Sequence, residues 1–91
     1  MMEKTIFYKD YTPENGMELT WEPNFEIKCE VYGNIVQICA NESGLLSLAN
    51  HLITLSQQSV PNGYHLHLDS GNSLENGSCE LIFSKAERMH I

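Results

Sequence analysis

The apolar residues between Asn41 and Gln58 recur with a helical period, and no other stretch of the chain sustains such a period. On a helical wheel, one half of this segment is apolar and the opposite half is polar. The apolar half comprises Leu45, Leu46, Leu48, Ala49, Leu52, Ile53 and Leu55, and the polar half comprises Ser47, Asn50, His51, Thr54 and Gln58. An apolar arc of this width predicts a helix that lies flat on a sheet and buries its leucines.

Both ends of this helix carry recognisable signals. Asn41 or Ser43 can accept hydrogen bonds from the free amides of the first turn, and Glu42 suits the positive end of the helix dipole. The segment Val60-Pro61-Asn62-Gly63 ends the helix, because proline disfavours helical geometry in the residue before it and Asn-Gly favours a turn.

A strict alternation of apolar and polar residues from Phe25 to Tyr32 predicts a strand, and Gly33-Asn34 joins it to a second strand, Ile35–Ala40. Glycine stands where a type II′ turn requires it. The expected pairs are Tyr32 with Ile35, Val31 with Val36, Glu30 with Gln37, Cys29 with Ile38, Lys28 with Cys39 and Ile27 with Ala40. This register places apolar residues opposite one another on the inward face, and a shift of one residue would destroy that match.

Four more strands are predicted, separated by turns rich in proline, glycine and asparagine. They are Lys4–Tyr11 and Met17–Trp21 before the hairpin, and Tyr64–Asp69 and Ser78–Lys85 after the helix, with turns at 12–16 and 70–77. The fold class is therefore α+β, a two-layer sandwich in which one long helix packs on one face of an antiparallel or mixed sheet. We expect a single domain over residues 1–91, with N-terminal strands and turns at 1–24, the core at 25–85 and a loose tail at 86–91.

The charge balance narrows the choice of partners. Twelve acidic residues face five basic ones, a net charge of −7, which argues against nucleic acid and anionic membranes as direct partners. Five of the acids, Glu14, Glu18, Glu22, Glu26 and Glu30, recur every four residues. They form either a solvated face that keeps the protein soluble or an acidic surface for a basic protein partner. No apolar run could span a bilayer and the first residues do not resemble a secretion signal, so we expect a cytoplasmic protein.

Metal binding and catalysis both have candidate residues. His65, His67 and Asp69 alternate on one strand face, but neighbours on such a face lie about 7 Å apart, which makes convergence on one ion difficult. The three cysteines, Cys29, Cys39 and Cys79, lack a Cys-x-x-Cys pair, and we interpret them as reduced thiols that act as small core residues. A cysteine with a histidine could form a thiol nucleophile, but no catalytic motif accompanies them. We predict no cofactor, no metal and no enzymatic activity.

The outer face of the predicted sheet combines apolar, aromatic and acidic residues. It is expected to carry Tyr32, Ile35, Gln37, Cys39, His65, His67, Asp69, Glu80 and Ile82, with Glu26 and Glu30 nearby. Apolar anchors surrounded by charge suit a protein interface. The alternative is that this face is buried in a homodimer or under the N-terminal strands.

Three segments, VYGNIVQICANESGLLSLANHLITL, VPNGYHLHLD and LENGSCELIFSK, resemble the immunity protein 32 family of bacterial polymorphic toxin systems. The resemblance covers roughly Phe25 to Lys85. It implies a small cytosolic antidote that is made beside a secreted toxin, from a neighbouring gene, and that binds this toxin to protect the cell that makes it. The resemblance names no toxin and no catalytic residue.

The sequence therefore favours an immunity protein that occludes a cognate toxin through an acidic, partly apolar surface. The candidate toxin-binding residues are Glu26, Glu30, Tyr32, His65, His67, Asp69, Glu75 and Glu80. The alternatives are a small metal-binding or hydrolytic domain that uses His65, His67 and Asp69, and a structural homo-oligomeric module. A homodimer is compatible with any of these functions.

Overall fold

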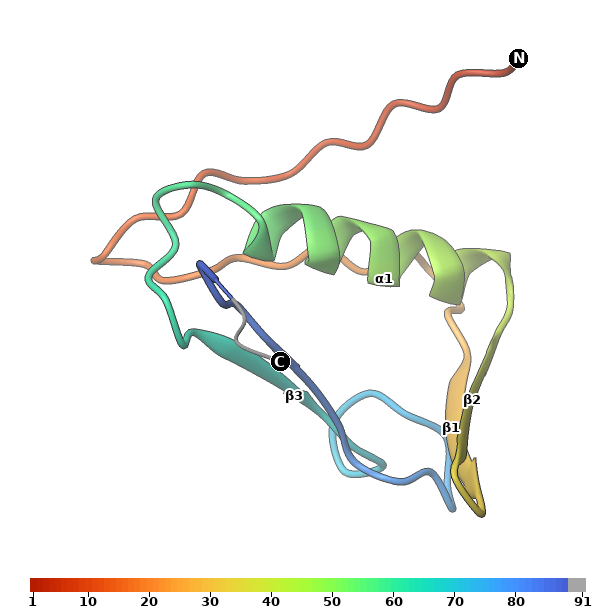
Figure 1. Ribbon diagram of the computed structural model, residues 1–91. Helices are drawn as coiled ribbons and strands as arrows, with labels where there is room; N and C mark the ends of the chain where they lie inside the picture. Colours follow the sequence, from red (N-terminus) through yellow and green to blue (C-terminus); the bar gives the residue numbers. More distant parts are fainter. Residues whose placement is uncertain (89–91) are drawn as a thin grey trace.

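The computed structural model describes residues 1–88 and has the α+β class that the sequence predicts. Its elements in chain order are β1 (Ile27–Tyr32), β2 (Ile35–Ala40), α1 (Glu42–Leu55), β3 (His65–Leu68) and β4 (Leu81–Ser84). The strands form two separate antiparallel hairpins, β1–β2 and β3–β4, in place of the single sheet expected from the sequence. Figure 1 shows α1 spanning the open side between the hairpins, which converge away from the helix. Among the described residues no helix could cross a membrane.

The β1–β2 hairpin has the predicted register at all of its pairs, from Tyr32 with Ile35 at the turn to Ile27 with Ala40 at the open end. Gly33 has a φ of +61° while Asn34 is not among the residues with positive φ, as a type II′ turn requires. The register is correct because the turn chemistry and the alternation of apolar residues specify the same pairing.

Helix α1 begins where its capping signals predict. The Asn41 side chain accepts a hydrogen bond from the Gly44 amide at 2.7 Å, and Glu42 lies in the first turn. Gly44 is buried against the hairpin, where a Cβ atom would overlap the Glu26 carbonyl oxygen and come within 2.9 Å of Ile27 Cγ1. Glycine at this position therefore allows the first turn of the helix to approach β1 closely.

The predicted buried face of α1 is wrong. Leu45 is 56% exposed and Leu52 is 45% exposed, whereas four polar residues from the opposite half of the wheel are buried. These buried residues are Ser47, Asn50, His51 and Thr54. Leu48 and Leu55 lie on the boundary between the two halves and are buried as expected. Compared with the orientation that the helical wheel predicts, the helix is thus rotated about its axis, so that much of its polar half faces the protein interior.

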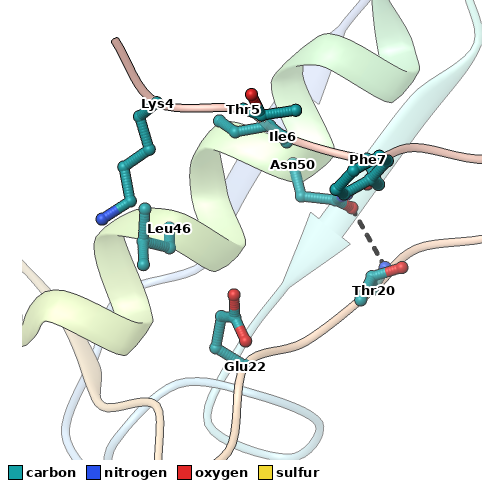
Figure 2. A pocket seen from close by; sticks show the side chains of 8 residues that line it. All are labelled: Lys4, Thr5, Ile6, Phe7, Thr20, Glu22, Leu46 and Asn50. Carbon is teal, nitrogen blue, oxygen red and sulfur yellow. Dashed lines mark hydrogen bonds between the residues drawn. The ribbon is translucent and has the colours of Figure 1, made fainter. Parts of the chain in front are cut away.

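The N-terminal segment explains this rotation. Residues 1–24 contain no strand, apart from an isolated bridge between Thr12 and Gly16 at the predicted turn, so both predicted N-terminal strands are wrong. Instead, this part of the chain runs in extended form along the helix (Figure 1). The Asn50 side chain accepts from the Thr20 amide at 3.0 Å (Figure 2), and it donates to the Phe7 carbonyl at 2.8 Å. Polar helix side chains thus replace the missing strand partners of this backbone.

Other helix side chains make the same kind of bond to the N-terminal segment. Ser47 accepts from the Glu22 amide at 2.8 Å, and Gln57, just beyond the helix, accepts from the Tyr11 amide and donates to the Lys9 carbonyl, each at 2.9 Å. The N-terminal residues and the helix also enclose a cavity of about 200 Å³. It is lined by Lys4, Thr5, Ile6, Phe7, Thr20, Glu22, Leu46 and Asn50 (Figure 2).

The core lies between the helix and the two hairpins. Its buried apolar cluster comprises Ile27, Cys29, Leu48, Leu68 and Leu74. The loop that follows β3 supplies Leu74 and then continues along β1, where the amides of Glu75 and Cys79 donate to the carbonyls of Ile27 and Cys29 at 2.8 and 2.9 Å. This loop therefore connects the two hairpins. In the predicted C-terminal tail, the Glu87 amide donates to Asn62 Oδ1 at 2.9 Å, and residues 89–91 lie outside the described residues.

Candidate functional site

The outward face of β1 carries two of the predicted toxin-binding residues side by side. Glu30 and Tyr32 are two positions apart on one strand, so their side chains project from the same face. The pKa of Tyr32 is raised above its ordinary value of 10.0, mainly because hydrogen bonding to the nearby Glu30 side chain favours the protonated phenol. Tyr32 is 54% exposed, so this phenol remains accessible to a partner.

Glu26 and Glu75 lie close together although they are far apart in the sequence. Both line a shallow hollow of about 260 Å³ that also includes Lys28 and Asn41. The Glu26 carboxylate accepts a hydrogen bond from Asn41 Nδ2 at 3.1 Å, and the Glu75 backbone is held against β1 through its bond to Ile27. The structure thus places three acids, Glu26, Glu30 and Glu75, along β1.

The β1–β2 hairpin also exposes large apolar side chains on both of its faces. Five of them are between 39% and 62% exposed, namely Val31, Tyr32, Ile35, Val36 and Ile38. All six residues of β2 are exposed or half-buried, because the core covers only the part of β1 around Ile27 and Cys29, away from the turn of the hairpin. A large exposed apolar patch beside charged residues is characteristic of an interaction surface. The sequence analysis assigned Val31, Val36 and Ile38 to the buried face, and that assignment is wrong.

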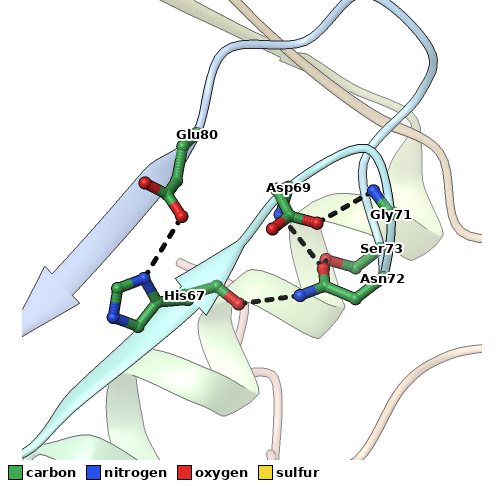
Figure 3. Close-up of polar contacts among 6 residues, drawn as sticks. All are labelled: His67, Asp69, Gly71, Asn72, Ser73 and Glu80. Carbon is green, nitrogen blue, oxygen red and sulfur yellow. Dashed lines mark hydrogen bonds and ion pairs between the residues drawn. The ribbon is translucent and has the colours of Figure 1, made fainter.

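The second group of predicted residues lies on the β3–β4 hairpin. His67 Nδ1 is 3.3 Å from Glu80 Oε2, and both side chains are about half exposed (Figure 3). The rings of His65 and His67 pack edge to face with centroids 4.8 Å apart, while His65 Nδ1 lies 2.9 Å from the Gly63 carbonyl oxygen. The outward side of this hairpin is therefore an exposed polar cluster of two histidines and one carboxylate.

Asp69 does not join the two histidines. Its Oδ1 accepts a hydrogen bond from the Gly71 amide at 2.8 Å, and its own amide donates to Asn72 Oδ1 at 3.0 Å (Figure 3). Asn72 Nδ2 in turn donates to the His67 carbonyl at 3.1 Å. The predicted turn after β3 is thus an internally bonded loop that uses the Asp69 carboxylate. Within residues 1–88, no three histidine, cysteine or acidic side chains are placed to hold a metal ion.

The structure separates the predicted outer face into two clusters, one on each hairpin. We call Glu26, Glu30, Tyr32 and Glu75 the β1 cluster, and His65, His67 and Glu80 the β3–β4 cluster. They belong to different sheets, so the single continuous face that the sequence predicted is not formed. The exposed β2 strand lies beside the β1 cluster. The exposure of β2 could have been predicted from its uncharged sequence IVQICA, since an edge strand without charge or proline lacks the usual protection against pairing.

The cysteines fill two different environments. Cys29 is fully buried and Cys79 is half-buried, with their sulfur atoms 2.9 Å apart, whereas Cys39 is exposed and is not the core residue that was predicted. Burial, followed by the hydrogen bond with Cys79, raises the pKa of the Cys29 thiol to about 11. Cys29 is therefore protonated at neutral pH and is a poor nucleophile.

His51 is a buried residue whose environment could not be predicted from the sequence. It is 0% exposed, its ring packs edge to face on Trp21 with centroids 4.1 Å apart, and among the described residues neither of its nitrogens has a hydrogen-bond partner. Burial lowers the pKa of His51 from its ordinary value of 6.5, and the Thr20 backbone opposes this shift. The folded protein thus favours the neutral imidazole.

This environment predicts a loss of stability in mild acid. Because the pKa of His51 is lower in the folded state, the unfolded chain binds the proton first, and the free energy of unfolding falls as the pH drops below about 6.5. The contribution of one group is at most about 1.4 kcal/mol per pH unit. Urea denaturation between pH 7.5 and 5.5 should show this decline. It should be smaller in His51→Leu and unchanged in His65→Gln, which alters an exposed histidine. An equal decline in His51→Leu would exclude His51 as its cause.

Comparison with known proteins gives one match. The family model described as Immunity protein 32 matches residues 35–86, which is 52 of the 91 residues and includes β2, α1, β3 and β4. No curated protein and no solved structure matches the chain. The match begins after β1, so the N-terminal segment along the helix and part of the β1 cluster lie outside it. Because the matched region covers more than half of the chain, this protein belongs to the immunity protein 32 family.

Proposed function

We propose that this chain is an immunity protein that binds its cognate toxin in the cytoplasm of the producing cell and occludes it. Membership of the immunity protein 32 family implies an immunity role. The observation that supports direct binding is the exposed β1–β2 hairpin, where large apolar side chains lie beside Glu26, Glu30 and Glu75. Apolar groups of this kind supply affinity, and the neighbouring acids would steer a basic partner.

Immunity proteins are generally not enzymes, and this role requires only binding. The metal-dependent alternative needs His65, His67 and Asp69 to converge, but the Asp69 carboxylate is engaged within its own loop. A homo-oligomeric module is the second candidate function, because the exposed, uncharged β2 strand could pair with a second copy of itself.

Charge reversal tests the proposal. Changing both Glu26 and Glu30 to lysine should slow association with the toxin domain encoded by the neighbouring gene by about tenfold or more at low salt, and dissociation should change less. Surface plasmon resonance at two salt concentrations measures both rates. Rescue of cells that express the toxin measures the biological consequence, and thermal melts establish folding, because Glu26 also bonds the helix cap.

The matched control is reversal of Glu14 and Glu18. These residues are exposed in the N-terminal segment, and their reversal changes the net charge by the same amount. The control pair should slow association much less than the Glu26 and Glu30 pair. Equal effects of both pairs would show that only the overall charge matters, and the absence of any complex with the toxin domain would refute the proposed function.

A further inference from the structure

The pairing register of β2 determines which of its backbone groups face β1. In an antiparallel hairpin with a two-residue turn, the residues that flank the turn exchange hydrogen bonds, and every second residue after them points away. Ile35, Gln37 and Cys39 therefore bond to β1, whereas Val36 and Ile38 direct their amides and carbonyls to the opposite edge.

The outer edge of β1 supports this assignment independently. The same alternation directs the backbone groups of Ile27 and Cys29 outward, away from β2. There the Ile27 carbonyl accepts from the Glu75 amide, the Cys29 carbonyl accepts from the Cys79 amide, and the Cys29 amide donates to Ser78 Oγ at 3.1 Å. The loop that follows β3 thus covers the outer edge of β1.

The far edge of β2 has no such cover. Within residues 1–88, no segment pairs with it and no hydrogen bond to the outward groups of Val36 and Ile38 is formed. The strand contains no charged residue and no proline, and its register has no bulge. Natural edge strands normally carry at least one of these devices to prevent pairing with another chain. An edge without these devices is open to pairing with a partner strand.

The charges beside this edge select the partner. Glu30 extends from β1 and Glu26 from the residue just before this strand, Lys28 lies between them, and the whole chain carries −7, so the net charge beside the edge is negative. A second copy would bring the same acids and the same net charge to the contact, so Coulomb repulsion opposes self-pairing. A strand flanked by lysine or arginine is attracted instead.

We propose that β2 receives an extended, basic-flanked segment of the toxin as an additional strand, with backbone hydrogen bonds to Val36 and Ile38. This inference rests on the proposed function and specifies its binding mode. In strand addition, the backbone bonds supply affinity, and alternate side chains supply specificity. The incoming side chains would lie beside Val36 and Ile38 on one face of the hairpin and beside Ile35 and Gln37 on the other.

Amide hydrogen exchange, measured by NMR on the protein with and without the toxin domain from the neighbouring gene, tests this arrangement directly. The Val36 and Ile38 amides should exchange rapidly in the free protein and slow by about tenfold or more in the complex. A complex in which both amides still exchange rapidly would overturn strand addition while leaving the immunity role intact. If no complex forms, the proposed function itself fails. Slow exchange of both amides in a toxin-free dimer would assign the edge to a second copy and also overturn the proposal.

A matched pair of variants distinguishes the contribution of the Val36 backbone amide to toxin binding from that of the Val36 side chain. Val36→Pro removes the outward amide, whereas Val36→Thr keeps the amide and the branched shape. Val36→Pro should raise the Kd for the toxin domain by about tenfold or more relative to Val36→Thr, because both substitutions change the apolar side chain but only proline also removes the backbone donor. Retained exchange protection at Ile35 and Gln37 confirms that the hairpin of each variant is folded. Equal Kd values for folded Val36→Pro and wild-type protein would overturn the proposal.

Discussion

Leu48→Ala is expected to lower the free energy of unfolding by about 2–5 kcal/mol, the range for a leucine whose removal leaves a cavity. Leu48 is only 8% exposed and belongs to the buried cluster with Ile27, Cys29, Leu68 and Leu74. This cluster combines residues of the helix, of both hairpins and of the loop that connects them, so the removal of Leu48 disturbs the packing at its centre. Urea denaturation followed by circular dichroism gives the loss, and an unchanged m-value shows that the two-state comparison is valid.

Leu52→Ala is the matched control, because it makes the same chemical change on the same helix. Leu52 is 45% exposed, so the loss should be below about 1 kcal/mol. The sequence pattern placed both leucines in the core, and it therefore predicts similar losses for the two variants. Equal losses would show that α1 is oriented as the wheel predicts and that the observed burial of its polar half is incorrect.

Trp21→Ala has the second largest expected effect, a loss of about 3 kcal/mol. The ring of Trp21, the only tryptophan in the chain, packs on Phe25 with centroids 4.5 Å apart and on the buried His51. Its removal leaves a gap between the N-terminal segment and the helix. It also opens His51 to water, so the stability of the variant should depend less on pH between 7.5 and 5.5.

Trp21→Phe tests whether the loss of stability in Trp21→Ala comes from lost aromatic packing or from any substitution at this position. This variant keeps an aromatic ring against Phe25 and His51, so its loss of stability should be clearly smaller than that of Trp21→Ala. Circular dichroism is the appropriate signal, since both variants lack tryptophan fluorescence. If Trp21→Ala were as stable as wild-type protein, the N-terminal segment would not be part of the cooperatively folded structure.

The candidate site was predictable where it depends on neighbours along one strand or one hairpin. Glu30 and Tyr32 share a face because side chains alternate along a strand, and that rule needs no tertiary information. The proximity of Glu26 and Glu75 was not predictable, because it depends on how the loop after β3 runs along β1. The removal of Asp69 from the histidine face likewise results from bonds within that loop.

The sequence by itself determined the features that depend on local chemistry: the register of the β1–β2 hairpin, the Asn41 cap and the turn after β3. Tertiary structure alone decided the orientation of α1. Apolar periodicity locates a buried face only when the neighbouring elements are apolar. Here an extended backbone without strand partners packs on the helix, and it requires donors and acceptors from residues such as Asn50 and Ser47. Hydrogen bonding to that backbone buries polar side chains of the helix and leaves Leu45 and Leu52 exposed. A helical wheel cannot predict this, because it takes no account of the neighbouring backbone.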